Sequence, residues 1–175
     1  RLTMACGAVA DVWFVLLLTR AHGEYNYLPV YGMNLSWALL AGATVAIGLF
    51  AYGASLNDVD DARHDETFSP ERPIPAGRIR VGQAIVLTVG ALIVAMPGGV
   101  QMDTGAAVMT LIAATCILFY NAAGKFIPAV GLITVGLIHA IHMRIPNYQL
   151  EFMLPVWLVM THAMVVAALV HHLED

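Results

Sequence analysis

The stretch that decides the fold covers residues 35–65 and reads LSWALLAGATVAIGLFAYGASL (35–56) followed by NDVDDARHD (57–65). Its first part carries no charged side chain, and about 20 mostly apolar residues are enough for a helix to cross a membrane. Its second part brings four aspartates together within nine residues. The sequence therefore predicts a transmembrane helix that ends in a group of carboxylates at the membrane surface.

The rest of the chain has the same apolar character. Only 11% of the 175 residues are charged and 59% are apolar, whereas soluble domains carry about 25% charged residues. We therefore predict an all-α integral membrane protein with about six transmembrane helices. The Pro97-Gly98-Gly99 sequence is expected to end the third one. The predicted spans are Leu2–Thr19, Leu35–Leu56, Val81–Met96, Gly105–Asn121, Phe126–Met143 and Phe152–Leu173.

The basic residues predict the orientation of the protein, because cytoplasmic loops carry the excess of Arg and Lys. With six spans, most of them fall on the side of the 57–80 loop, and only Arg20 and Arg144 fall on the other. We expect this loop to face the cytoplasm, in a bacterial inner membrane. No basic tract suggests a nucleic-acid partner. The residues on the predicted cytoplasmic side are Arg1, Arg63, Arg72, Arg78, Arg80 and Lys125.

The acidic cluster has helical spacing. If the helix continues through it, Asp58, Asp61 and Asp65 lie at i, i+3 and i+7, and Asn57 precedes Asp61 and Asp65 by one and two turns. Asp60 projects to another side and is left outside the predicted site. Crowded carboxylates need a counter-ion, and Mg²⁺ takes one or two carboxylates together with water and substrate phosphate. The alternative interpretation is a solvated acidic loop.

The residues that follow the cluster favour the functional interpretation. They read SPERPIPAGR (69–78). The prolines fix the backbone as it leaves the helix, and Arg72 and Arg78 offer donors suited to phosphate oxygens. The combined pattern, N-D-x-x-D-x-x-x-D followed by P-x-R-P-I-P-x-G-R, is similar to the first aspartate-rich signature of the UbiA superfamily. In this resemblance the metal-binding positions are Asn57, Asp58, Asp61 and Asp65, and the matching residues of the following segment are Arg72, Pro73, Pro75 and Gly77.

A second, weaker resemblance lies in FYNAAGK (119–125). Members of the superfamily often carry a tyrosine followed within a few residues by a lysine near the diphosphate. In this sequence those residues are Tyr120 and Lys125, so Lys125 is a candidate for binding phosphate. The alternative is a lysine at a helix end that extends to the membrane surface.

Ionisable residues inside apolar segments are costly and are therefore candidates for function. His139 and His142 lie one turn apart on the same predicted helix and are expected to line a cavity, although such histidines are more often satisfied by neighbouring helices. Aromatic side chains, Tyr120 among them, are further cavity candidates. A proton-relaying transporter is a third hypothesis, based on Asp11, His139, His142 and His162.

The resemblance implies a barrel of nine transmembrane helices. It also implies Mg²⁺-dependent transfer of an isoprenyl group from its diphosphate to a hydrophobic acceptor, usually an aromatic ring. Residues 1–175 are expected to form the N-terminal two-thirds of one such domain. HHLED (171–175) does not read as D-x-x-x-D, so the second acidic motif either starts just beyond Asp175 or has been lost. The alternative is a catalytically degenerate UbiA-like subunit that binds lipid or pigment, or that packs within a larger membrane complex.

Overall fold

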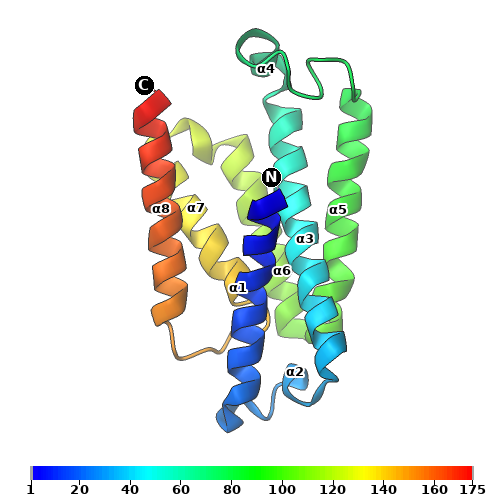
Figure 1. The fold of residues 1–175 in the computed structure, drawn as a ribbon, viewed down its shortest axis with the longest axis vertical. Coiled ribbons are helices and arrows are strands. Elements are labelled where there is room, and N and C mark those ends of the chain that lie inside the picture. Colours follow the sequence, from blue (N-terminus) through cyan, green and yellow to red (C-terminus); the bar gives the residue numbers. More distant parts are fainter. Residues whose placement is uncertain (1, 175) are drawn as a thin grey trace.

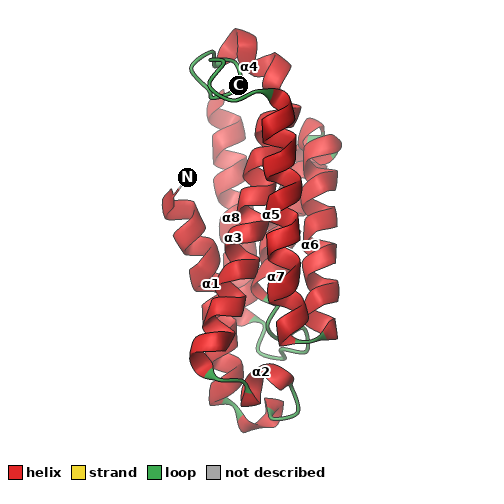
Figure 2. Cartoon of the chain, turned by 90° about the vertical axis from the view of Figure 1, so that its right-hand side faces the viewer, coloured by secondary structure: helices red, strands yellow, loops and turns green. Residues whose placement is uncertain are grey.

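The computed structural model describes residues 2–174, and every regular element in that range is a helix (Figure 1). Six long helices run along the long axis of the molecule, joined at its two ends by loops and short helices (Figure 2). The all-helical prediction is therefore confirmed. The long helices are α1 (Leu2–Ala21), α3 (Leu35–Asp60), α5 (Val81–Met102), α6 (Thr104–Ala122), α7 (Pro128–Met143) and α8 (Leu154–Glu174). The short ones are η1 (Gly23–Tyr25), α2 (Pro29–Gly32), α4 (Ala62–Phe68) and η2 (Gly124–Phe126).

The outer surface of the bundle suits a lipid environment. Within the described residues, α1, α3, α5 and α6 are long and apolar enough to cross a membrane, while α7 and the Leu154–Val170 part of α8 are apolar but shorter. Large apolar side chains such as Leu87, Ile93 and Val94 are exposed on α5. Contact with lipid chains is favourable for such an apolar surface, whereas contact with water is not. We conclude that this is an integral membrane protein.

The third helix is longer than its sequence suggests. The prediction that Pro97-Gly98-Gly99 ends it at Met96 is wrong, because α5 continues through these residues to Met102. The glycines serve close packing instead of a turn. A Cβ on Gly98 would lie 2.7 Å from the backbone oxygen of Ala41 on α3, and one on Gly99 would lie 2.6 Å from Thr110 Oγ1 on α6. Small residues of this kind let transmembrane helices approach each other closely.

The helices alternate in direction, so that two sets of connections gather at opposite ends of the bundle. We call one of them the acidic end: it contains the end of α3, α4, the 69–80 loop and η2, and α8 ends there too (Figure 1). The opposite end holds η1, α2 and the 144–153 connection. Arg1, which was counted in the predicted charge asymmetry, and Asp175 lie outside the described residues.

Candidate functional site at the acidic end

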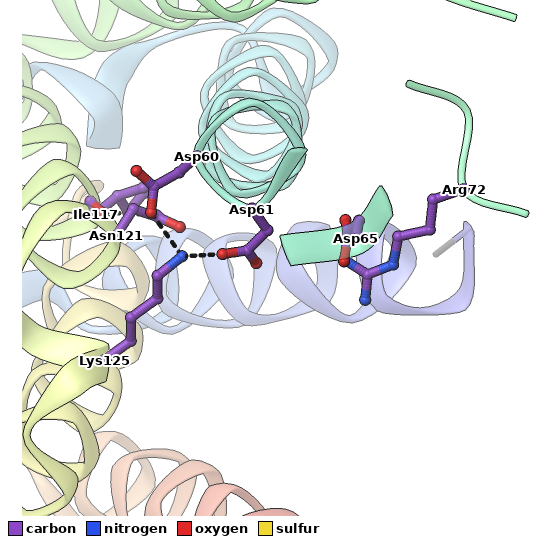
Figure 3. Close-up of polar contacts among 7 residues, drawn as sticks. All are labelled: Asp60, Asp61, Asp65, Arg72, Ile117, Asn121 and Lys125. Atoms are coloured by element: carbon purple, nitrogen blue, oxygen red, sulfur yellow. Dashed lines mark hydrogen bonds and ion pairs between the residues drawn. The ribbon is translucent and has the colours of Figure 1, made fainter. Parts of the chain in front are cut away.

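Lys125 lies between two carboxylates at the acidic end (Figure 3). Its Nζ is 2.7 Å from Asp60 Oδ2 and 2.5 Å from Asp61 Oδ1. Burial by itself lowers the pKa of this lysine, but its hydrogen bonds and charge interactions with Asp60 and Asp61 outweigh that effect and leave the pKa raised. Lys125 is therefore a fixed positive charge that connects η2 to the end of α3.

The expectation that Asp60 points away from the other carboxylates is wrong, because Asp60 and Asp61 contact the same lysine. Asp60 is the last residue of α3, Asp61 occupies a turn and α4 begins at Ala62, while Asp61 N still donates to the Asn57 oxygen at 2.9 Å. Adjacent helical positions differ by about 100° around the axis, yet the long side chain of Lys125 approaches this turn from η2 and reaches both carboxylates. The Asp65 N–H still donates to the Asp61 oxygen four residues earlier, at 2.8 Å, but the Asp65 carboxylate pairs with Arg72.

Asp65 forms a second ion pair, with Arg72. Arg72 Nη1 donates to Asp65 Oδ2 at 2.8 Å, and Asp65 is only 3% exposed. Figure 3 draws this pair away from Lys125, with Asp61 between the two groups. The loop that carries Arg72 turns sharply at Gly77, whose φ of 71° favours glycine. The structure therefore uses Arg72, a predicted phosphate ligand, to neutralise a buried carboxylate.

Two of the predicted site residues lie elsewhere. Asp58 lines a separate cavity of about 230 Å³, together with Pro73 and Ile74 of the loop. Arg78 is exposed and donates from Nη2 to the backbone oxygen of Glu71 at 2.9 Å. Asn57, Asp61 and Lys125 thus lie around the same cavity. Asp58 and Arg78 are not among the residues that line it.

Two adjoining cavities meet at this place. The charged cavity, of about 640 Å³, is lined by residues that include Asp60, Asp61 and Lys125. The central cavity, of about 300 Å³, lies between α1, α3, α6 and α7, and none of the residues that line it carries a carboxylate, lysine or arginine. Both cavities are lined by Asn57, Tyr120 and Val135. A ligand with a charged head and an apolar body can therefore occupy the two together.

The central cavity contains the predicted His139 and His142, and one residue that the sequence analysis missed. Asn121 lines it from the last turn of α6 and is 4% exposed. The sequence carried one signal that could have identified Asn121: it is an amide side chain within an apolar helix, one turn before Lys125. Asp11 and His162, which the transporter hypothesis requires, are not among the residues that line either cavity.

Asp60 and Asp61 offer the oxygen donors that a magnesium ion bound together with a phosphate group would need. Asp60 and Asp61 present carboxylate oxygens to the charged cavity, and oxygen is the donor that Mg²⁺ prefers. Within residues 2–174, no three His, Cys, Asp or Glu side chains are grouped as a metal cage. Mg²⁺ often takes only one or two carboxylates and completes its shell with water and substrate phosphate, which agrees with this arrangement.

Comparisons with known proteins point to the same family. The profile of the UbiA prenyltransferase family matches residues 8–175. A digeranylgeranylglyceryl phosphate synthase of Saccharolobus solfataricus is 32% identical over 95 residues, 54% of this chain and 31% of that protein. The synthase of the same name from Sulfurisphaera tokodaii is 27% identical over 118 residues, 67% of this chain and 40% of that protein. Both relatives are archaeal and give no support to a bacterial origin.

A solved structure shares the fold. It comes from work described as "Structural and mechanistic insights into the biosynthesis of Digeranylgeranylglyceryl phosphate synthase in membranes", with a TM-score of 0.65 and 18% sequence identity. The match covers 94% of this chain and 60% of that one. The chain thus spans less than half the length of the curated relatives that it matches and 60% of the solved one. With the family profile covering nearly all of its residues, the chain belongs to the UbiA prenyltransferase family.

Proposed function

We propose that the complete protein transfers an isoprenyl group from its diphosphate to a hydrophobic acceptor at the acidic end. The observation that carries the proposal is the junction of the two cavities at Asn57 and Tyr120. An isoprenyl diphosphate has a charged head and an apolar chain. The charged cavity suits the head, and the apolar central cavity suits a hydrocarbon chain or a hydrophobic acceptor.

The side chains at the acidic end have distinct roles in this proposal. Lys125 offers a positive charge to the diphosphate, and Asp60 holds its Nζ when Asp61 turns to another partner. Arg72 fixes Asp65 and leaves its remaining donors for phosphate oxygens. Asn57 and Tyr120 lie where the head and the chain of the ligand would meet. Bound Mg²⁺ would neutralise the charge that develops on the leaving diphosphate.

The reaction is a substitution at the first carbon of the isoprenyl group. The bond between this allylic carbon and the diphosphate oxygen breaks, and the electron pair leaves with the diphosphate. A nucleophilic atom of the acceptor forms the new bond to the carbon and loses its proton, which the released diphosphate can take. Positive groups such as Lys125 favour this step because they lie where negative charge accumulates on the leaving group.

The relatives favour a lipid acceptor over an aromatic one. Both curated relatives are named digeranylgeranylglyceryl phosphate synthases, and that product name describes an isoprenoid glycerol phosphate. We propose a lipid acceptor of this general kind, in an integral membrane enzyme with its acidic end at the cytoplasmic surface. The excess of Arg and Lys on this side supports the orientation.

The test is a prenyl-transfer assay on the full-length protein in detergent, with geranylgeranyl diphosphate and farnesyl diphosphate as donors. Wild type is compared with Asp61→Ala and with Glu66→Ala, an exposed acidic residue on α4 that serves as the matched control. We expect Mg²⁺-dependent release of pyrophosphate that falls about 100-fold or more in Asp61→Ala and is retained in Glu66→Ala.

Wild-type protein that binds the donor but releases no pyrophosphate would contradict the proposal. That outcome would favour the alternative from the sequence, a degenerate family member that binds lipid or pigment or serves in a larger complex. One observation is consistent with it: Asp60, Asp61 and Asp65 are all neutralised by basic residues of the chain itself.

A further inference from the structure

The central cavity follows α3 for about two helical turns. Leu49, Gly53 and Asn57 are spaced at i, i+4 and i+8 on this helix, and all three line the cavity. Positions with this spacing lie on one face of a helix, and the step from Leu49 to Asn57 rises about 12 Å. Asn57 also lines the charged cavity, whereas Leu49 is not among the residues that line it. The central cavity therefore extends from its junction with the charged cavity into the bundle.

Helix α7 gives the cavity the same direction and nearly the same length. Val135 lines both cavities, and Ile138, His139 and His142 line only the central one. Since α7 begins beside η2 at the acidic end, these residues lie progressively farther from that end. Val135 and His142 are about 10 Å apart along the helix axis. Two helices thus agree that the cavity is elongated, with its junction at the acidic end.

Gly53 lies halfway along this cavity and faces α6. A Cβ at position 53 would lie 3.2 Å from Cγ2 of Ile117, which lines the same cavity. Carbon atoms pack best at about 3.5–4.0 Å, so a side chain at position 53 has to displace Ile117. The volume it needs is taken from the cavity or from the packed core around Ile117, and overpacking a core is unfavourable. The missing side chain of Gly53 therefore keeps the cavity open one turn from Asn57.

An extended isoprenyl chain matches the direction of this cavity. A diphosphate in the charged cavity places the chain attached to it at the junction, beside Asn57. Carbon–carbon bonds are about 1.5 Å long, so one isoprene unit, with four carbons along the chain, spans about 5 Å when extended. The first unit then reaches from the junction to about Gly53, and the second lies beyond it, towards Leu49. None of the residues that line the cavity carries a carboxylate, lysine or arginine, which suits an uncharged chain.

We propose that the isoprenyl chain of the donor lies in the central cavity and passes Gly53, which makes Gly53 a specificity-determining residue for chain length. The identity of the ligand rests on the proposed prenyl transfer, whereas the open space beside Gly53 is a property of the cavity. A side chain at position 53 narrows the path of the second isoprene unit but leaves the diphosphate and the first unit in place. It therefore weakens the binding of longer donors more than that of dimethylallyl diphosphate.

A small set of variants separates this effect from general damage. Gly53→Ala adds a methyl group that meets Ile117, and Ile117→Phe narrows the cavity at the same level from α6. Combining Gly53→Ala with Ile117→Ala removes the side chain that the new methyl group meets, and so restores the space. Gly90→Ala is the control, because its added Cβ has no described neighbour within 4 Å and Gly90 does not line the cavity. Thermal unfolding verifies that each variant is folded.

The experiment measures binding to the full-length protein in lipid nanodiscs, with Mg²⁺ and without an acceptor. The ligands are the S-thiolodiphosphates of the dimethylallyl, geranyl and geranylgeranyl groups, in which sulfur replaces the bridging oxygen and slows loss of the diphosphate. Empty nanodiscs correct for partitioning into lipid. We expect wild type and Gly90→Ala to bind the geranyl analogue about tenfold more tightly than the dimethylallyl analogue, because the second unit buries apolar surface.

The narrowed variants are expected to lose this preference. In Gly53→Ala and in Ile117→Phe it should fall below about threefold, with the affinity for the dimethylallyl analogue nearly unchanged. The geranylgeranyl analogue should be weakened at least as much as the geranyl one, since its chain passes the same point. Gly53→Ala combined with Ile117→Ala should recover the preference of wild type.

The proposal is overturned if wild type binds none of the analogues or all of them equally, or if both narrowed variants keep the preference. It is also overturned if these variants are folded but lose the dimethylallyl analogue to the same extent as the longer ones. The proposed function fails separately: a protein that selects donors by length at Gly53 but transfers no isoprenyl group keeps this site and loses the enzyme activity. Prenyl transfer that is insensitive to narrowing at Gly53 would place the chain elsewhere.

Discussion

At the scale of single residues, the acidic end is held together by two ion-paired groups, Asp60–Lys125–Asp61 and Asp65–Arg72. Lys125 is 13% exposed, so its charge is only partly screened by water. The first group joins η2 to the end of α3, and the second joins the loop that carries Arg72 to α4. The contribution of each group to stability can be measured separately, because Lys125 loses its charge at high pH whereas Arg72 stays charged.

Lys125 gives the protein a pH-dependent contribution to stability. Its pKa in the folded protein lies above the ordinary value of 10.5 because Asp60 and Asp61 favour the charged form. The contribution is therefore fully present below pH 10.5 and is lost as the pH rises through the folded pKa. We expect Lys125→Met to lower the free energy of unfolding by about 1 kcal/mol near neutral pH and by less at about pH 11. Lys125→Arg, which keeps the charge, is the control.

Thermal unfolding in detergent, followed by circular dichroism, measures this difference at each pH. If wild type and Lys125→Met differ in unfolding free energy by the same amount near neutral pH and at about pH 11, the ion pairs of Lys125 do not stabilise the protein as inferred.

Arg72 stabilises a carboxylate that has little access to water. Because Asp65 is 3% exposed, Arg72→Met would leave its charge buried and unpaired, which costs several kcal/mol in a protein interior. Arg72 itself is 38% exposed, and screening by water reduces the expected loss to about 2 kcal/mol. Arg78→Met is the matched control, since Arg78 is exposed and bonds to a backbone oxygen in the same loop. Equal thermal destabilisation of both variants would argue against a special role for the Asp65–Arg72 pair.

At the scale of elements, α5 packs closely on α3 through positions without side chains. A Cβ on Gly98 would lie within 2.7 Å of a backbone oxygen on α3, whereas a Cβ on Gly90 of the same helix would have no neighbour within 4 Å. We expect Gly98→Ala to force the helices apart and to destabilise the protein by about 2 kcal/mol. Gly90→Ala should be neutral, or stabilising by up to about 1 kcal/mol, because alanine favours helices.

Thermal unfolding of the two alanine variants measures the difference between them. Equal destabilisation would mean that loss of glycine from α5 matters more than its contact with α3. Stabilisation by both substitutions would mean that α5 can move away from α3 at little cost.

At the scale of the whole molecule, the acidic end and the opposite end should lie on different sides of the membrane. Glu66 on α4 and Glu24 on η1 are both exposed and mark these two ends. In a background with Cys6 and Cys116 replaced by alanine, we introduce Glu66→Cys or Glu24→Cys. In intact spheroplasts, a membrane-impermeant maleimide should label Glu24→Cys at once but Glu66→Cys only after permeabilisation. The reverse pattern would invert the proposed orientation.

The sequence by itself determined the class of fold and the family. A helix satisfies every backbone group within its own segment, as a long uncharged segment in a membrane requires, and these segments correspond to the long helices of the structure. The motif of residues 57–78 and the matches to relatives agree on the UbiA family. Lys125 was also a candidate from the sequence, through the resemblance of residues 119–125 to the tyrosine–lysine pattern of the superfamily.

Only the tertiary structure decided how the side chains are grouped. Lys125 approaches from η2, 64 residues after Asp61, and contacts both Asp60 and Asp61, while Asp58 lines another cavity. Pro97-Gly98-Gly99 remains helical because α3 and α6 pack against it. Asn121 lines a cavity that is formed between four helices. Local sequence cannot specify such features, because each depends on contacts between segments that only folding brings together.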